Sequence, residues 1–174
     1  MTIIVEGPDG GGKTTLVRAL SRELKLPIHS RHCTSEGGPL EGLFDWAHAD
    51  VALSPFQRAS IYDRHPYVSE YIYGNLLRGG VSEEFLSETA HQDLGVMADN
   101  YLVIFSIPTL ETLQANIQAT PQMEGVESNV EALYWAYREA YAHWPGHKIF
   151  YDYEITPLKD VVYQAKSFLV GKGK

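Results

Sequence analysis

A run of glycines beside a lysine and two threonines is the strongest chemical signal in this sequence. Residues 7–14 spell GPDGGGKT, which matches the pattern G-x-x-x-x-G-K-[ST], and they lie between an apolar run and a helical stretch. Glycines let backbone N–H groups turn inward around phosphate oxygens, while the lysine bridges the outer phosphates and the first threonine completes a magnesium shell. The residues expected to bind ATP are Gly7, Pro8, Gly10, Gly11, Gly12, Lys13, Thr14 and Thr15.

A second chemical signal is the pair Asp63-Arg64, which follows the short apolar run 59–62. Parallel strands end at the sheet edge where ligands bind. There, Arg64 would donate hydrogen bonds to a phosphate, and the Asp63 carboxylate would hold magnesium-bound water. The expected catalytic residues are Lys13, Asp63 and Arg64, and the expected magnesium ligands are Thr14 and Asp63. The alternatives are a glycine turn without a ligand and a surface salt bridge at a strand end.

Apolar runs alternate with amphipathic stretches along the chain, which is typical of a parallel sheet covered by helices on both faces. The expected strands are 2–6, 27–29, 59–62, 101–107 and 148–151. Together with the glycine loop, this pattern predicts an α/β protein with the three-layer P-loop NTPase fold. Its five-stranded parallel sheet should have the order 2-3-1-4-5 and be flanked by helices.

Capping residues mark where several helices should begin and end. Ser82 should cap a helix that carries acidic residues in its first turn and stops at Gly95. Ser128 and Glu131 form a capping-box pattern ahead of an apolar stripe at helical spacing, which favours core packing over a ligand cage. Helices are expected over 13–25, over 82–94, after 128 and after 156.

The charge of the chain limits its partners. Its 174 residues hold 14 Lys and Arg against 22 Asp and Glu, which gives a formal net charge of -8. That balance disfavours a broad electrostatic hold on duplex nucleic acid, because such affinity comes from neutralising phosphates with cations. Small-molecule nucleotides are therefore the expected partners, and nucleic acid is disfavoured but left open. The length is that of one globular domain, 1–174.

Other sequence features indicate a cytoplasmic enzyme without membrane or metal-cluster elements. The start MTIIVEG lacks a basic leader, no apolar stretch approaches membrane-spanning length, and the single Cys33 has no partner for an internal disulfide. His29, His32 and Cys33 form H-x-x-H-C, but a structural zinc site usually needs a fourth ligand at recognisable spacing, so we favour an interpretation without zinc.

Residues 5–15, VEGPDGGGKTT, together with Asp63-Arg64-His65, resemble thymidylate kinases and their deoxynucleoside-kinase relatives. Those kinases carry E-G-x-D-G-x-G-K-T-T at the start. They also carry D-R-Y-x-x-S-x-x-A-Y-Q-G, which has a same-length counterpart at 63–74, DRHPYVSEYIYG. The resemblance spans most of the chain, and its shortened, diverged form resembles kinases encoded by bacteriophages. It implies ATP- and magnesium-dependent phosphoryl transfer to a deoxynucleotide, and a homodimer.

The resemblance also concerns the acceptor side. Asp9 matches the family's loop acid, which faces the acceptor sugar, and TSEGGP at 34–39 is a loose counterpart of the family's T-R-E-P-G-G-T. Aromatic side chains near these segments could stack on a base. The expected acceptor-binding residues are Asp9, Phe44, Trp46, Arg64, Tyr67 and Tyr71.

Two departures from the family limit what carries over. Residues 71–74, YIYG, stand where the family has A-Y-Q-G, so thymine specificity does not follow. Neither the phosphate loop 7–15 nor the expected lid 109–129 contains the arginine that the family places in one of them. Three explanations stay open: a distant arginine such as Arg138 moves in, a partner subunit supplies one, or the chain is a weak or specialised kinase. The further candidate arginines are Arg31, Arg58 and Arg78, of which Arg58 enters its strand from the opposite end.

The sequence leaves three functions open. The leading one is phosphorylation of a deoxynucleoside monophosphate, thymidylate-like or a modified pyrimidine nucleotide, to the diphosphate. The second is a kinase that acts on a hydroxyl of a nucleoside or of a hydroxymethylated base in DNA, with Asp63, Glu36 or Asp9 as general base. The third is a non-catalytic nucleotide-binding module.

Overall fold

A five-stranded parallel sheet forms the centre of the protein. The computed structural model describes residues 2–29, 32–33 and 40–171. The strands pair in the order β2-β3-β1-β4-β5, every pair parallel, which confirms the predicted fold class and strand order. The strands are β1 Thr2–Glu6, β2 Ile28–His29, β3 Ser60–Asp63, β4 Tyr101–Ser106 and β5 His147–Tyr151.

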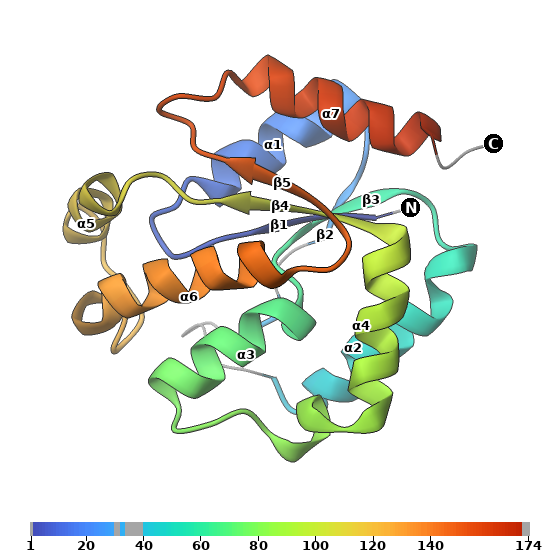
Figure 1. The fold of residues 1–174 in the computed structure, drawn as a ribbon, viewed down its shortest axis with the longest axis horizontal. Coiled ribbons are helices and arrows are strands. Elements are labelled where there is room, and N and C mark those ends of the chain that lie inside the picture. Colours follow the sequence, from blue (N-terminus) through green and yellow to red (C-terminus); the bar gives the residue numbers. More distant parts are fainter. Residues whose placement is uncertain (1, 30–31, 34–39, 172–174) are drawn as a thin grey trace.

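Helices cover both faces of the sheet and make three layers (Figure 1). On one face lie α1 and α7, and on the other lie α2, α3, α4 and α6. The bounds are α1 Lys13–Leu24, α2 Leu43–Leu53, α3 Pro66–Leu77, α4 Glu88–Asn100, α5 Leu110–Gln118, α6 Val130–His143 and α7 Leu158–Gly171. None of the helices in the described ranges is long and apolar enough to cross a membrane.

The central strands β1 and β4 are buried along their whole length, which explains why their sequences are apolar without alternation. Successive side chains of a strand point to opposite faces, so the side chains of β1 pack into two separate cores. Ile4 packs into the core beneath α2, α3, α4 and α6, whereas Ile3 and Val5 pack into the core beneath α1 and α7. The sheet therefore holds the C-terminal end of β1 rigidly, and the glycine loop starts there.

The helix predicted from Ser82 to Leu94 is wrong at both ends. Residues 83–86 form a short 3-10 turn, and α4 begins only at Glu88, because the Ser87 hydroxyl caps it by accepting from the Ala90 N–H at 3.2 Å. The helix then continues through Gly95 to Asn100. Burial of Met97 in the core outweighs the roughly 1 kcal/mol that a helical glycine costs.

The capping box predicted for Ser128 and Glu131 is also wrong. Residues 127–129 form a 3-10 turn, so Ser128 lies inside that turn and its hydroxyl donates to the Gly125 carbonyl at 3.1 Å. Asn129 is the N-cap of α6 and makes no side-chain capping bond. The helix itself is confirmed, and its apolar stripe lies in the core as expected.

Candidate active site

The glycine loop takes the conformation that its sequence requires. It joins β1 to α1, and Gly7, Gly10 and Gly12 have φ values of 147°, 75° and 80°, in the region that other residues avoid. At Gly7 a Cβ atom would lie 2.2 Å from the Ser106 carbonyl oxygen, so a side chain is excluded on steric grounds as well. The loop thus turns between strand and helix with no room for larger residues.

Two side chains from distant elements hold the loop. The Ser106 hydroxyl, at the end of β4, donates to the Gly11 carbonyl at 2.6 Å. On α5, the Asn116 amide donates to the Gly10 carbonyl at 2.9 Å and to the Tyr153 hydroxyl at 2.8 Å. The sequence analysis missed both, because no local pattern links residues so far apart. These bonds hold two carbonyls of the loop in place, and a third bond within the loop joins the Gly11 N–H to the Pro8 carbonyl at 3.1 Å.

Lys13 is nearly buried at the start of α1. Its ammonium group donates to the Pro8 carbonyl at 2.6 Å, inside the loop itself. Burial and, after it, the charge of Arg64 lower the pKa of Lys13 to about 7, while Asp9 and Asp63 oppose the shift. An anionic phosphate in the loop would stabilise the charged form of this lysine.

Arg64 lies beside the loop with its guanidinium buried and its backbone at a left-handed φ of 70°. Its Nη2 donates to the Gly7 carbonyl at 3.1 Å, to Asp9 Oδ1 at 2.8 Å and to the Tyr73 hydroxyl at 2.7 Å. Its Nη1 and Nε have no hydrogen-bond partner within the described parts of the chain. Three of the five N–H donors of this arginine therefore bond to none of the described residues.

One cleft of about 560 Å³ brings most of the predicted residues together. Asp63 and Arg64 line it together with the segment 119–122 that follows α5. Of the expected lid 109–129, the first half is helix α5, and this short segment reaches the cleft; lid motion stays a prediction. The cleft is lined by Asp9, Gly10, Gly12, Lys13, Thr14, Thr15, Asp63, Arg64, Asn116, Ala119, Thr120, Pro121 and Gln122.

Magnesium fits the donors that the cleft offers. The Thr14 hydroxyl and the Asp63 carboxylate both line it, beside Lys13. Magnesium prefers oxygen ligands and is usually held by one or two protein groups together with water and phosphate oxygens. The chemistry of this donor set is therefore that of a magnesium-triphosphate site.

The predicted aromatic residues lie behind this cleft rather than on its described lining. Phe44 packs edge-on against Tyr67 at 6.2 Å, and Trp46 lies 5.7 Å from His65. The hydroxyl of Tyr67 donates to the Asp93 carboxylate, and that of Tyr71 donates to a backbone carbonyl. Each of the four has a packing role, and contact with an acceptor stays a prediction. Glu36, Arg31 and the segment 34–39 lie outside the described residues.

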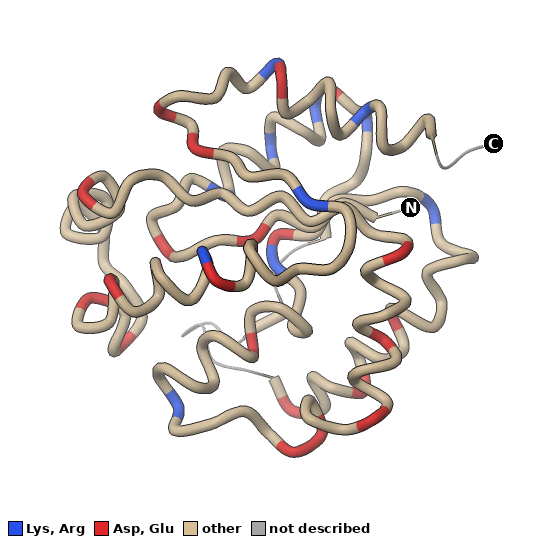
Figure 2. The backbone as a smooth tube through the Cα atoms, viewed as in Figure 1, with Lys and Arg blue, Asp and Glu red and all other residues tan. Residues whose placement is uncertain are grey.

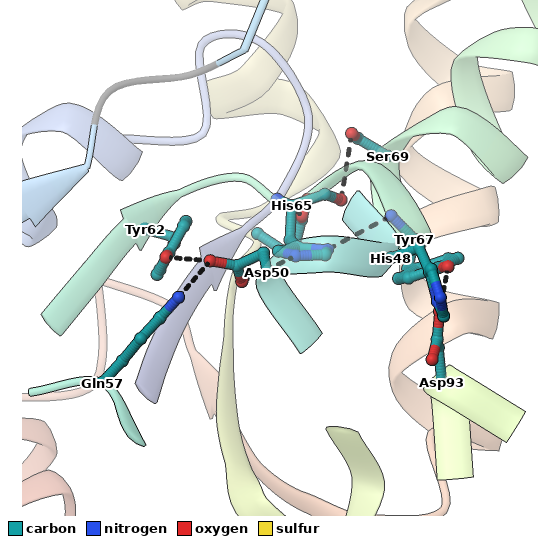
Figure 3. Close-up of polar contacts among 9 residues, drawn as sticks. His48, Asp50, Gln57, Tyr62, His65, Tyr67, Ser69 and Asp93 are labelled. Carbon is teal, nitrogen blue, oxygen red and sulfur yellow. Dashed lines mark hydrogen bonds and ion pairs between the residues drawn. The ribbon is translucent and has the colours of Figure 1, made fainter. Parts of the chain in front are cut away.

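A buried pair that the sequence analysis missed connects α2 to the residue after Arg64 (Figure 3). His65 is fully buried, its Nδ1 accepts from the Tyr67 N–H at 3.3 Å, and its Nε2 lies 3.5 Å from Asp50 Oδ2. Because Nδ1 accepts a bond, the ring proton belongs on Nε2, facing Asp50. Asp50 also accepts from the Tyr62 hydroxyl at 2.6 Å. The pair fixes the start of α3 directly behind the cleft.

Glu6 completes the floor of the site at the end of β1. One carboxylate oxygen accepts from the His65 N–H at 2.8 Å and the other from the Tyr137 hydroxyl at 3.3 Å. Burial raises the pKa of Glu6 to about 7, against the opposing charge of Arg64. Glu6 is thus a buried polar group that joins β1 to the residue before α3 and to α6 through hydrogen bonds.

The other candidate arginines of the described chain lie away from the cleft lining. The Arg138 guanidinium lies over the rings of Tyr134 and Phe150, at 5.8 and 5.3 Å from their centres. Arg78 pairs with Glu70, and Arg58 is exposed. Figure 2 shows the lysine and arginine positions scattered over several elements, with acidic positions between them. Lys13 and Arg64 are thus the cations that the described cleft provides.

No protein-family model matches the chain, and no curated protein matches it. Among solved structures, the YorR protein from Bacillus subtilis, in complex with phosphorylated GDP, matches with a TM-score of 0.73 at 20% identity, over 98% of this chain and 96% of that one. Deoxyadenosine kinase from M. mycoides, with dCMP and dCDP bound, matches at 0.62 and 16% identity over 98% and 99%. Shikimate kinase from Acinetobacter baumannii, in complex with shikimate, matches at 0.54 and 13% over 99% and 94%. The chain has the fold of P-loop kinases.

Proposed function

We propose that this chain is an ATP- and magnesium-dependent kinase that phosphorylates a deoxynucleoside monophosphate, a thymidylate-like or modified pyrimidine nucleotide. The observation that carries the proposal is the single cleft that Lys13 and Thr14 share with Asp63, Arg64 and Asp9. A triphosphate seated in the glycine loop would end within the same cleft as the buried arginine. Donor and acceptor phosphates can therefore meet there.

The residues of the cleft fit the demands of phosphoryl transfer, which are positioning and charge neutralisation. The loop N–H groups and Lys13 hold the donor phosphates, and Lys13 gives up its bond to the Pro8 carbonyl to do so. Thr14 and Asp63 would hold magnesium, which would neutralise charge on the outer phosphates. An acceptor phosphate oxygen attacks the γ-phosphorus, the bond to the bridging oxygen breaks, and ADP leaves with the nucleoside diphosphate as product.

The unused donors of Arg64 support a phosphate acceptor. A buried guanidinium with three spare N–H groups favours an oxyanion, because hydrogen bonds between ionised partners are about twice as strong as neutral ones. The solved structures of similar fold include proteins with phosphorylated GDP and with dCMP and dCDP bound, and a nucleotide acceptor here agrees with them. Thymidylate-like specificity, a phage origin and a homodimer stay predictions from the resemblance.

A hydroxyl acceptor is the second candidate. Asp9 and Asp63 are the carboxylates on the cleft, and either could take a proton from an attacking hydroxyl. One structure of similar fold is a deoxyadenosine kinase, which supports considering nucleosides beside nucleotides.

The decisive experiment incubates the protein with ATP, magnesium and a panel of deoxynucleoside monophosphates, nucleosides and oligonucleotides. ADP release is followed, and the product mass is measured. Diphosphate product supports the proposal, phosphorylated nucleoside or DNA supports the hydroxyl candidate, and ATP binding without turnover supports a binding module. Lys13→Ala should abolish turnover, whereas Lys159→Ala, an exposed lysine on α7, should leave it unchanged. Turnover that survives Lys13→Ala would refute the mechanism.

A further inference from the structure

We propose that Tyr73 is a positioning residue for Arg64, holding the guanidinium and the Asp9 carboxylate in the geometry that phosphoryl transfer requires. The inference rests on the proposed function and extends it to a residue of the third turn of α3. Tyr73 is 1% exposed, so its ring is part of the core, but its hydroxyl reaches the edge of the cleft.

The hydroxyl of Tyr73 closes a three-membered polar ring. It accepts from Arg64 Nη2 at 2.7 Å and donates to Asp9 Oδ2 at 2.8 Å, while Asp9 Oδ1 accepts from the same Nη2 at 2.8 Å. An arginine can only donate and an ionised carboxylate can only accept, so the direction of each bond is fixed. The Tyr73 hydroxyl therefore holds the guanidinium of Arg64 and the carboxylate of Asp9 at the same time.

The ring of Tyr73 adds a second contact to the same guanidinium. The Arg64 Cζ atom lies 4.7 Å from the ring centre, within the range of a cation–π interaction. All the side-chain hydrogen bonds that Arg64 makes with described residues come from Nη2, whereas the buried Nη1 and Nε bond to none of those residues. Tyr73 thus helps to set the orientation of the Arg64 guanidinium, through the hydrogen bond to Nη2 and the contact with its ring.

Tyr73 is itself held from the opposite side of the site. Its ring packs edge-on against Tyr137 of α6 at 6.2 Å, and the Tyr137 hydroxyl donates to Glu6 at the end of β1. The buried chain of contacts therefore runs from the sheet through α6 and α3 to the glycine loop. A side chain fixed this way can act as a rigid reference for Arg64, whose own backbone is at a left-handed φ of 70°.

Tyr73→Phe removes only the hydroxyl and keeps the ring. Hydrogen bonds to charged groups contribute about 1.5–3 kcal/mol, so kcat/KM for the acceptor should fall about 10- to 100-fold. The KM for ATP should change less than about threefold, because the Tyr73 hydroxyl bonds to Arg64 and Asp9, whereas Lys13 and Thr14 are the groups proposed to hold the triphosphate and its magnesium. If Tyr73 had only a structural role, its replacement would not lower kcat/KM for the acceptor while leaving the KM for ATP nearly unchanged.

The matched control is Tyr62→Phe. It removes another buried tyrosine hydroxyl that donates to an aspartate, Asp50, at 2.6 Å. We expect a lower melting temperature for this variant and a loss in kcat/KM of less than about threefold, because Asp50 keeps its contact with His65 at 3.5 Å. Thermal melts of both variants establish that each is folded at the assay temperature.

A double-mutant cycle makes the test specific to Arg64. In an Arg64→Lys background the guanidinium that Tyr73 orients is gone and only the bond to Asp9 remains, so Tyr73→Phe should lower kcat/KM by less than about threefold there. An equal loss in both backgrounds, or a Tyr73→Phe variant as active as Tyr62→Phe, would overturn the positioning role. If the wild-type protein turns over no acceptor at all, the proposed function itself fails, which is a separate result.

Discussion

Glu6→Gln should make the stability of the protein less dependent on pH. The Glu6 carboxylate is completely buried at the end of β1, where it accepts from the His65 N–H and the Tyr137 hydroxyl. Burial raises its pKa from 4.5 to about 7, and the positive charge of Arg64 opposes that shift. Glutamine keeps the shape of the side chain and removes the titration.

The sign and size of the effect follow from the shift in pKa. Because the folded-state pKa is above the unfolded value, the stability that Glu6 contributes is fully present below pH 4.5 and is lost as the pH rises through about 7. A rise from 4.5 to about 7 corresponds to about 3 kcal/mol. The free energy of unfolding of Glu6→Gln, minus that of the wild type, should therefore increase by about 3 kcal/mol between pH 4.5 and 8.

The assay is urea unfolding of both proteins at several pH values from 4.5 to 8, since the difference between them cancels the titrating groups that Glu6 does not influence. Lys13, whose pKa is lowered to about 7, is present in both proteins, and the charge of Glu6 is the weakest of the five influences on that pKa. Glu131→Gln, an exposed glutamate on α6, serves as the control and should show no such trend. A difference between Glu6→Gln and the wild type that stays constant across this pH range would refute the reasoning.

Four further predictions concern the loop, a glycine of α4 and the distant arginine. Gly7→Ala should abolish ATP binding, since its Cβ would lie 2.2 Å from a backbone oxygen, whereas Gly95→Ala, in open space on α4, should stabilise the protein by about 0.5–1 kcal/mol in thermal melts. Asn116→Ala removes the hydrogen bond to the Gly10 carbonyl and should raise the Kd for ATP measured by calorimetry. An unchanged Kd would mean that the loop keeps its conformation without Asn116. Arg138→Ala should keep turnover within about threefold of wild type, because its guanidinium packs on two aromatic rings; a much larger loss would show that it enters the site.

The sheet and the loop were predictable because the signals for them are local. Strands buried on both faces are written as uninterrupted apolar runs, and the expected 2–6 and 101–107 correspond to Thr2–Glu6 and Tyr101–Ser106. Two helices had no such signal. α2 begins after Gly42 without a side-chain cap, and α3 is capped by the imidazole of His65 rather than by the hydroxyl or carboxylate that marks most helix starts.

By itself, the sequence determined the glycine loop and the strand that precedes it, because glycine, lysine and threonine at fixed spacing are enough to specify a phosphate-binding turn. It also placed Asp63 and Arg64 at a strand end. Only the tertiary structure decided which side chains hold these groups. Asn116 bonds to the glycine loop, and Tyr73 bonds to Arg64 and Asp9. These contacts join residues from separate elements, and their geometry exists only once the helices have packed on the sheet.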